Sequence, residues 1–572
     1  MRLMYLLDLL TILTLLAVSS TIATPPSRQS SWMAPRMGIP DSFELPANTA
    51  LPGSNEPLFI EMPLDHFTNL TVDGVTTFQN RYWINASYYE AGGPVFIFDS
   101  GEQNAEPLVP YYLQEYHGLS ATMRLAKRYG GIAILWEHRY YGDSLPFPIS
   151  RNTTPQQWQF LTTEQALEDV VFFADSFSKN SSVSTGSLNS SATILPQSLP
   201  LHPSVTPWVW LGGSYPGVRG ALLRQRNPGT IFAAWASSAP VHAQVDMWAY
   251  YAAAERSLTR NCSADWVAVT KYVDTVLQGA NESAAVDIKF DLLKARLSGP
   301  GGNTTGADGL TKEQANRTSD VDAASILMDP LDFYQYYGFA DSLLPFCNLL
   351  ETRNFTAAPV EGGVVSVSGV EGAFLAFLAA LAELDYDSIP GSPDDPAGDM
   401  SWMRQYCSEY GFYQRGNPSD NLSIETSFLS LELFQQQCNE AFTDHLPSWP
   451  QVENINKYGG WNMQSSNIMF ANGEFDPWRT MGLASIEINA PQRKPSVVVP
   501  GCNVPSNATT FFGITYDNMV HVSDMRVLLV PDSNHTDFKT VGFYSPVSQA
   551  PFYTGLGLFQ LALDEWLPCF GK

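Results

Sequence analysis

The amino-acid sequence predicts an α/β protein whose mostly parallel sheet is interrupted by a large helical insertion. Short apolar runs bounded by glycine, at 94–98 and 131–136, are typical of buried parallel strands. These runs alternate with helical patterns, strand signals become few between 246 and 450, and the alternation returns after residue 465. A sheet that is interrupted by helices and then completed is the layout of an α/β-hydrolase fold with a large helical cap.

The first part of the predicted sheet domain covers residues 57–245. The helix predicted within it at 163–173 starts with a threonine followed by acidic residues, which suits a helix N-terminus. In chain order the predicted elements are a strand at 94–98, a helix at 111–128, a strand at 131–136, a helix at 163–173, a strand at 208–211, a helix ending at Arg226 and a strand at 232–239.

The predicted cap covers residues 246–450, and the sheet domain resumes at 451–572. Helical patterns at 266–277 and 374–384 are separated by polar or glycine-rich stretches, which indicates helices joined by surface loops. The last part contains predicted strands at 467–471, 496–499 and 511–516 and a helix at 556–566.

The composition favours an acidic, folded protein. Apolar residues make up 44% of the 572 residues and aromatic residues 12%, which supplies ample core and excludes a wholly disordered chain. Lys and Arg number 31 against 57 Asp and Glu, a formal net charge of −26. Because this charge repels phosphate backbones, we expect no nucleic-acid partner. It suits a protein that stays soluble in acidic surroundings.

The N-terminus predicts export from the cell. Residues 1–23 combine a basic start, an apolar run and small residues before a cleavage site, as a secretory signal peptide does. An uncleaved membrane anchor is the alternative, but Asp8 leaves the apolar run short of the ~20 residues that span a bilayer. No later stretch is long enough, so we expect no membrane partner.

Cysteines and glycosylation motifs agree with export. The six cysteines form an even set that allows three disulfides of undetermined pairing, and no Cys-x-x-Cys motif suggests a zinc site. The density of Asn-x-Ser/Thr tripeptides is typical of a heavily glycosylated secreted protein. Thirteen occur, at Asn69, Asn85, Asn152, Asn180, Asn189, Asn261, Asn281, Asn303, Asn316, Asn354, Asn421, Asn507 and Asn534.

Ser214 is the candidate nucleophile. It lies in Gly212-Gly-Ser-Tyr-Pro-Gly217, which follows a predicted strand and begins a helix. This is the context of a nucleophile elbow, where small neighbours are needed because the serine sits in a strained turn. Pro216 replaces the second glycine of the usual pattern, and proline is well tolerated in the first turn of a helix. The N–H of Tyr215 remains as the oxyanion donor.

The acid and the base are predicted from their order in the chain. In hydrolases of this layout the serine is followed by Asp or Glu and then by His. Asp476 follows the predicted strand at 467–471, and His521 and His535 are the two histidines in the last part of the sheet. His535 lies within a glycosylation motif, and a glycan beside a base would block substrate. We therefore favour His521 and keep His535 as the alternative.

With these residues placed, the chain resembles the prolyl carboxypeptidase and dipeptidyl peptidase II family of secreted and lysosomal serine peptidases, including its fungal acid members. The motifs cover both halves of the sheet domain, and the block at 137–147 is the most diagnostic. They are Asp65-His-Phe67, Phe78-Gln-Asn-Arg-Tyr82, Glu137-His-Arg-Tyr-Tyr-Gly-Asp-Ser-Leu-Pro-Phe147, Leu161-Thr-Thr-Glu-Gln-Ala-Leu167, Gly212-Gly-Ser-Tyr215, Asn472-Gly-Glu-Phe-Asp-Pro-Trp478 and His521-Val-Ser-Asp-Met-Arg526.

The resemblance implies Ser214 as nucleophile, Asp476 as orienting acid and His521 as base. It also implies cleavage after proline, with Trp478 as a wall of the proline pocket and Gly101-Glu102 as a loop beside the active site. Acyl transfer by these groups needs no metal and no organic cofactor. We interpret the charged block at 137–139 as a buried structural network.

The predicted function is a secreted serine peptidase that hydrolyses peptide bonds at proline at acidic pH. Its partners are peptide or protein substrates, its location is extracellular or in the lysosome or vacuole, and a homodimer is left open. A secreted lipase or esterase of the same fold and a non-catalytic secreted glycoprotein are the alternatives. The sequence does not distinguish a carboxypeptidase from a dipeptidyl peptidase or an endopeptidase.

Overall fold

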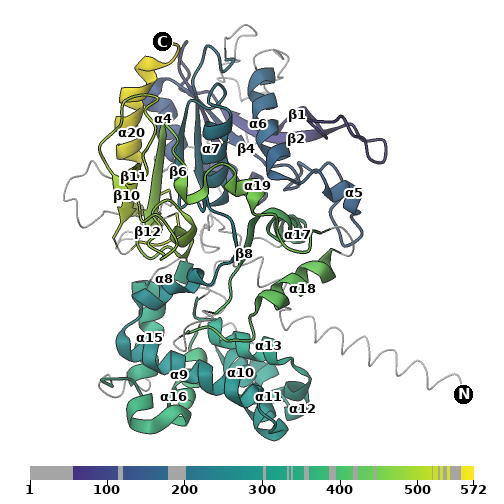
Figure 1. Ribbon diagram of the computed structural model, residues 1–572, viewed down its shortest axis with the longest axis vertical. Coiled ribbons are helices and arrows are strands. Elements are labelled where there is room, and N and C mark those ends of the chain that lie inside the picture. The colour runs from purple at the N-terminus through teal and green to yellow at the C-terminus, as the bar shows by residue number, and fades with distance from the viewer. Residues whose placement is uncertain are drawn as a thin grey trace, which may run out of the picture.

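The computed structural model describes residues 56–113, 120–177, 201–299, 304–331, 334–335, 339–352, 360–384, 395–416, 423–442, 446–517, 519–522, 524–525, 528–531, 538–541 and 555–572. Figure 1 shows a sheet covered by helices and, below it, a separate group of helices. The predicted signal peptide at 1–23 and the alternative base His535 lie outside the described residues. So do six predicted glycosylation sites, Asn180, Asn189, Asn303, Asn354, Asn421 and Asn534.

A nine-stranded sheet forms the centre of the larger part. In spatial order its strands are β1 (Leu58–Pro63), β2 (Thr77–Asn85), β4 (Ile132–Trp136), β3 (Val95–Asp99), β5 (Trp208–Gly213), β6 (Ala233–Ser237), β9 (Ile468–Gly473), β11 (Thr510–Tyr516) and β10 (Lys494–Ser496). The β1–β2 and β2–β4 pairs are antiparallel, and the other neighbouring pairs are parallel. This mostly parallel sheet confirms the predicted α/β-hydrolase fold.

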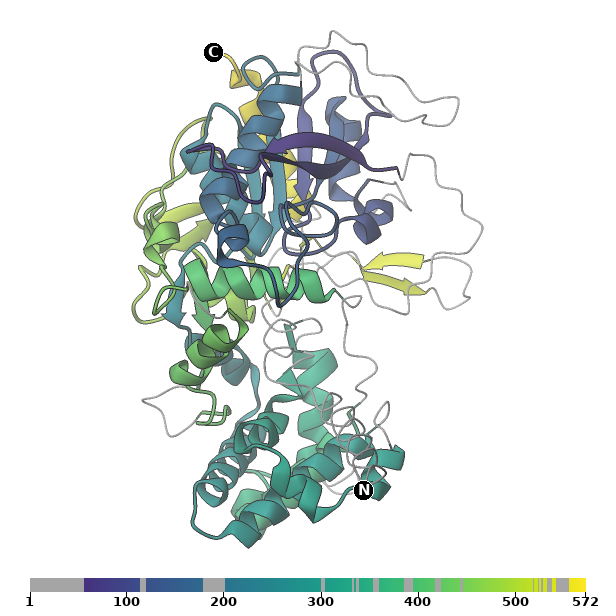
Figure 2. The same ribbon diagram turned by 90° about the vertical axis from the view of Figure 1, so that its right-hand side faces the viewer.

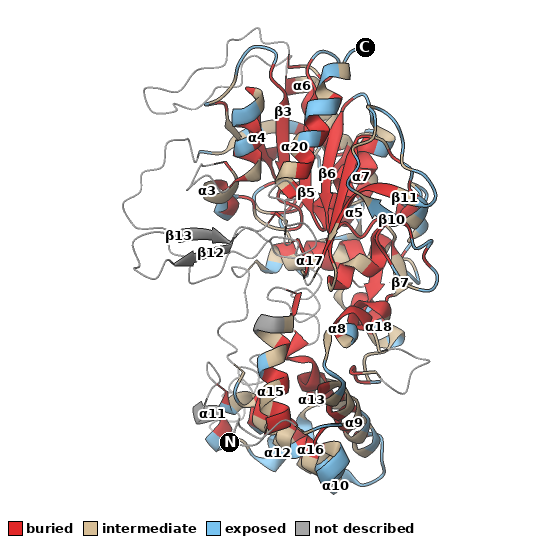
Figure 3. Ribbon diagram, turned by 90° about the vertical axis from the view of Figure 1, so that its left-hand side faces the viewer, coloured by how far each residue is buried: buried red, intermediate tan, exposed pale blue. Residues whose placement is uncertain are grey.

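Helices cover both faces of the sheet, as the alternating strands and helices predict. On one face, α4 (Ala121–Tyr129) and α20 (Gly555–Trp566) pack with strand side chains such as Trp235. On the other face, α6 (Thr163–Phe177) and α7 (Tyr215–Arg226) pack with side chains such as Trp210. Because both faces are covered, the central strands are buried along their whole length, as Figure 3 shows.

Two elements differ from the sequence prediction. The helix expected at 111–128 is described as α3 (Val109–Tyr112) and α4, and α4 starts where the Ser120 hydroxyl accepts a hydrogen bond from the Met123 N–H at 3.2 Å. Such a side-chain cap fixes the start of a helix. The strand expected at 496–499 lies at 494–496, and Val498 after it is 75% exposed. Its apolar run therefore belongs to the surface.

A group of helices lies between β7 (Gln244–Asp246) and β8 (Gly411–Tyr413), two short strands that pair with each other. Its core includes an aromatic cluster of Trp266, Phe346 and Phe377. The helices are α8 (Ala249–Ser257), α9 (Arg260–Leu277), α10 (Glu282–Ser298), α11 (Thr304–Gly309), α12 (Lys312–Arg317), α13 (Asp320–Ala324), α15 (Leu344–Thr352), α16 (Val365–Leu381) and α17 (Pro396–Gln405). The exact borders at 245 and 450 stay predictions.

Further elements of the described chain include α5 (Pro155–Trp158), α18 (Leu431–Ala441), α19 (Glu453–Asn456), the short helix η8 (Pro477–Met481) and the strand pair β12 (Leu528–Pro531) and β13 (Phe538–Val541). Figure 2 shows α17, the last helix of this group in chain order, and α18 between the sheet and the other helices of the group. Among the described residues, no helix has both the length and the apolar character needed to cross a membrane.

All six cysteines form disulfides, as the even count predicts. Cys262–Cys347 joins α9 to α15, and Cys407–Cys438 joins the end of α17 to α18. Cys502–Cys569 ties the segment after β10 to the C-terminus. Each bridge closes a loop of 31 to 85 residues and so restricts the unfolded chain.

A buried ion pair fixes the edge of the sheet domain. The Arg139 guanidinium donates from Nε to Asp169 Oδ2 at 2.6 Å, and neither side chain is more than 1% exposed. His66 Nε2 lies 2.8 Å from the other Asp169 oxygen. Burial alone raises the pKa of Asp169, but the Arg139 charge and these hydrogen bonds outweigh it and lower the pKa to about 2.

We expect Arg139→Ala to lower the free energy of unfolding by about 3–5 kcal/mol, because it leaves the buried Asp169 charge without its counter-ion. Arg128→Ala is the matched control, because its partner Asp564 is 43% exposed, and we expect a loss below about 1 kcal/mol. Urea unfolding followed by circular dichroism measures both. Equal losses in the two variants would refute a special role of the buried pair.

Candidate active site

The turn that carries Ser214 lies between β5 and α7. Ser214 has φ 65° and ψ −127°, a backbone conformation that few non-glycine residues adopt, and it is 2% exposed. Its N–H donates to the Ser237 carbonyl at 2.7 Å, which ties the turn to the end of the neighbouring strand β6. Pro216 lies in the first turn of α7, as the sequence predicts. This is the strained strand–turn–helix geometry of a nucleophile elbow.

Asp476 and His521 form a buried hydrogen-bonded pair. His521 Nδ1 lies 2.9 Å from Asp476 Oδ1, and neither residue is exposed. The same oxygen accepts the Trp478 N–H at 2.9 Å, because Asp476 caps η8 directly after β9. With Nδ1 donating to the carboxylate, the neutral imidazole carries no proton on Nε2, which is therefore a potential acceptor. The structure therefore brings the predicted acid and the favoured base together.

The loop that carries His521 is fastened to the end of β6, beside the Ser214 turn. The Val522 N–H donates to Ser238 Oγ at 2.8 Å. Asp524 accepts hydrogen bonds from Trp235 Nε1 at 3.0 Å and from the Ser237 hydroxyl. The Ser237 carbonyl also accepts the Ser214 N–H. The end of β6 therefore binds both the Ser214 turn and the loop that carries His521.

Two of these fastening residues could not be assigned from the sequence. Asp524 lies within the motif at 521–526, but nothing in that motif predicts its contacts, and Ser237 lies in an apolar strand with no pattern of its own. Burial raises the pKa of Asp524 to about 6, and the hydrogen bonds from Ser237 and Trp235 oppose this rise.

The predicted loop at Gly101-Glu102 lies against the nucleophile turn. Gly101 has φ +69°, and a Cβ atom on it would come within 2.4 Å of the Pro216 ring. Glu102 is 6% exposed, and its charge adds to burial in raising the pKa of Tyr215. This loop therefore needs glycine at position 101 and places a carboxyl group near the Ser214 turn.

Trp478 joins the base to the group of helices. Its ring centroid lies 6.2 Å from that of His521, 5.3 Å from Tyr250 and 5.2 Å from Phe412. Its Nε1 donates to Gln335 Oε1 at 3.2 Å. The sequence predicted Trp478, but Tyr250, Gln335 and Phe412 come from the insertion, where helical periodicity shows only that a residue is buried.

The block at 137–139 forms buried contacts beneath the turn. Glu137 binds the Arg81 guanidinium at 2.7 Å, and His138 Nε2 lies 2.9 Å from the Tyr215 hydroxyl. Burial, with the nearby Arg219 charge, lowers the pKa of His138 well below its usual range, so this imidazole is neutral. Within the described part of the chain, no group of three or more His, Cys, Asp and Glu side chains could hold a metal ion.

Seven predicted glycosylation sites lie among the described residues. Asn85 and Asn261 are half-buried, and the Asn85 amide donates to the Leu113 carbonyl at 2.7 Å. The other five are exposed, namely Asn69, Asn152, Asn281, Asn316 and Asn507. Glycosylation stays a prediction at all of them.

The mostly parallel sheet, the strained serine turn and the buried Asp–His pair define the class of protein as an α/β-hydrolase. The chain belongs to the serine carboxypeptidase S28 family, whose model matches residues 62–297 and 379–501. This confirms the resemblance drawn from the sequence motifs, since the relatives include a Pro-X carboxypeptidase.

Three relatives illustrate the similarity. A protein of Arthroderma benhamiae described as "Probable extracellular serine carboxypeptidase" is 29% identical over 77% of this chain and 62% of its own length. "Serine protease vicPb" of Bipolaris victoriae is 25% identical over 80% and 84%. Human "Lysosomal Pro-X carboxypeptidase" is 25% identical over 83% and 87%. The chain thus spans less than two thirds of the first relative.

We expect Asp524→Asn to remove part of the pH dependence of stability between about pH 4 and pH 6. The folded pKa of about 6 exceeds the ordinary value of 3.8, so folding takes up a proton in this window and the wild type loses stability as pH rises through it. Asparagine does not titrate, so the melting temperature of the Asp524→Asn variant should change less with pH in this range than that of the wild type. Asp175→Asn, at an exposed carboxyl, is the control. If the melting temperatures of wild type and Asp524→Asn change equally with pH, the raised pKa of Asp524 is contradicted.

Proposed function

We propose that the protein is a secreted serine peptidase in which Ser214 is the nucleophile, His521 the general base and Asp476 the orienting acid. The observation that carries the proposal is the buried 2.9 Å contact between His521 Nδ1 and Asp476, on a loop fastened beside the strained Ser214 turn. Family membership supports the same reaction class.

The proposed reaction is acyl transfer in two steps. His521 Nε2 removes the hydroxyl proton of Ser214 while the oxygen attacks the scissile carbonyl carbon, and the imidazolium then protonates the leaving amine. Asp476 fixes the tautomer of His521 and stabilises its positive charge. The Tyr215 N–H, at the start of α7, donates to the oxyanion. Water then releases the acyl group by the same route.

We propose that the enzyme acts at proline. The Trp478 ring meets the Tyr250 and Phe412 rings edge to face beside His521, and such an apolar wall suits the compact, apolar pyrrolidine ring. Gly101-Glu102 lies at the opposite side of the turn, where it would contact substrate. The relative named as a Pro-X carboxypeptidase supports the same preference. Action in an acidic extracellular or lysosomal compartment agrees with the net charge of −26.

We expect Ser214→Ala and His521→Ala to lower kcat/KM on a prolyl peptide by at least about 10⁴-fold, and Asp476→Asn to lower it severely through the wrong tautomer. Fluorophosphonate labelling should disappear in Ser214→Ala. His202→Ala is the surface control, and His535→Ala should also keep most activity. If His535→Ala is inactive and His521→Ala is active, His535 is the general base and the proposal for His521 is wrong.

We expect Trp478→Ala to lower kcat/KM for prolyl peptides by about tenfold or more, while an alanyl peptide loses less, because the ring contact is lost. Trp449→Ala, at a 40% exposed tryptophan, is the matched control. Hydrolysis of short-chain esters without any prolyl peptide turnover would instead identify an esterase. Mass spectrometry of one digested proline-rich peptide shows whether cleavage is C-terminal, N-terminal or internal.

A further inference from the structure

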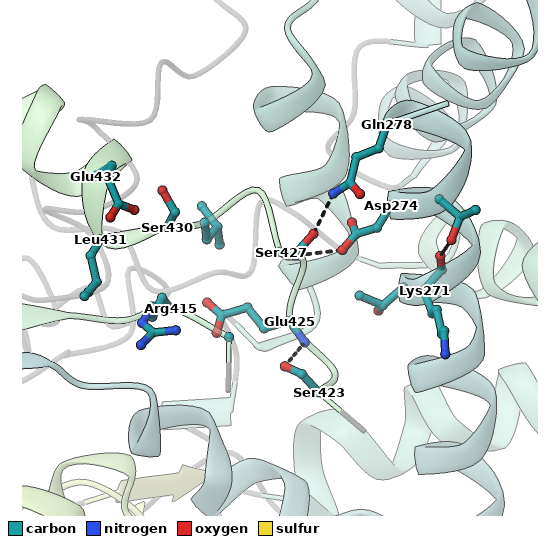
Figure 4. A pocket seen from close by; sticks show the side chains of 14 residues that line it. Lys271, Asp274, Gln278, Arg415, Ser423, Glu425, Ser427, Ser430, Leu431 and Glu432 are labelled. Carbon is teal, nitrogen blue, oxygen red and sulfur yellow. Dashed lines mark hydrogen bonds between the residues drawn. The ribbon is translucent and has the colours of Figure 1, made fainter. Parts of the chain in front are cut away.

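A cavity of about 500 Å³ opens on the outer side of α9, apart from the residues assigned to the proposed reaction. Figure 4 shows its walls, which come from α9, from the segment after β8 and from the segment that leads into α18. Polar and charged side chains line most of it, and Leu429 and Leu431 add an apolar strip.

Glu425 is the buried charge-bearing group of this cavity. It is 3% exposed, and neither carboxyl oxygen has a hydrogen-bond partner among the described residues. In Figure 4 its carboxyl group points toward Arg415. A buried carboxyl group with no partner is unfavourable, and it is rare in folded proteins.

The backbone around Glu425 is held in place on both sides. The Thr270 hydroxyl donates to the Ile424 carbonyl at 3.2 Å, and the Ser427 N–H donates to Asp274 at 2.7 Å. Both contacts come from α9, so the backbone that carries Glu425 is fixed to that helix. The site is therefore preorganised.

The other charges around the cavity leave Glu425 without a close counter-ion in the described residues. Arg415 donates from Nε to Asp246 at 2.9 Å, which occupies its charge, and Asp274 accepts the hydrogen bonds of its neighbours. Lys271 and Glu432 are exposed at the rim. Burial raises the pKa of Glu425 well above its usual range, Glu255 adds to this rise, and Arg415 opposes it.

We propose that this cavity binds an organic cation, an ammonium or guanidinium group on a short aliphatic chain, with Glu425 as its counter-ion. The cation supplies the missing hydrogen bonds and charge, and Leu429 and Leu431 pack against the methylene groups. A free diamine and a lysine or arginine side chain of a polypeptide share this chemistry, and the experiment separates them.

Binding should be coupled to proton release. The cation favours the ionised form of Glu425, so binding to the protonated group expels its proton, and affinity falls as pH falls. Lys271, Asp274, Arg415 and Glu432 also line the cavity, and the charge of Glu255 acts on Glu425, so comparison with Glu425→Gln isolates the part of the pH dependence that Glu425 contributes.

Isothermal titration calorimetry of the full chain tests the proposal with cadaverine, agmatine and a peptide carrying one internal lysine. We expect saturable binding of at least one probe at pH 7.5, weakened by about tenfold in Glu425→Gln and at pH 5, with 1-pentanol as the neutral control. Binding of the free amines alone identifies a small-molecule site, and binding of the peptide identifies a polypeptide ligand.

Glu432→Gln, at the exposed rim, should keep the affinity within about twofold. Leu431→Trp places a larger side chain in the cavity and leaves Glu425 itself unchanged, and it should abolish binding even if Glu425→Gln fails to fold. Equal affinity in Glu425→Gln and wild type, no saturable binding of any probe, or unchanged affinity in Leu431→Trp would each overturn the proposal.

Discussion

The strained turn at Ser214 is the constraint on which the rest of the sheet domain depends. Ser214 has a φ of 65°, and such a strained conformation persists only where the surrounding structure holds it in place. A Cβ atom at Gly213 would come within 2.6 Å of Val522, and one at Gly101 within 2.4 Å of Pro216. The base loop and the Gly101 loop therefore press on the turn from two sides. Both close contacts require glycine, at positions 213 and 101. The geometry of the candidate site therefore depends directly on how the strand ends pack.

The charges beneath this turn belong to the same constraint. Asp99, at the end of β3, accepts from Arg219 of α7 at 2.6 Å, and Glu137, after β4, binds Arg81. Each pair joins the carboxyl end of one central strand to an element beside it. Because ions buried in this way are stable only when paired, their geometry fixes how the strand ends meet. We infer that they position the turn and take no part in bond chemistry.

The sequence predicted the fold and much of the candidate site because both depend on local patterns. Apolar runs, glycine spacing and chain order pointed to Ser214 and Asp476 and left His521 and His535 as candidate bases, between which the glycosylation motif and the family resemblance favoured His521. Contacts between distant segments were not predictable. The 3.0 Å bond from Trp235 to Asp524 joins residues 289 apart, and the insertion supplies Phe412 to the Trp478 ring from a region of plain helical periodicity. The disulfide pairing was open for the same reason.

The buried carboxyl groups contribute to the pH dependence of stability in two opposite senses. Burial raises the pKa of Glu409, Glu425 and Asp524, so each of these groups weakens the folded state as pH rises through its own titration range. Asp169 acts in the opposite sense, because its lowered pKa removes stability only when pH falls toward about 2. At a pH between these titration ranges, the carboxyl groups with raised pKa are neutral and the Asp169 ion pair is intact. The net charge of −26 also shrinks on acidification, which acts on stability in the same direction and agrees with the proposed action at acidic pH.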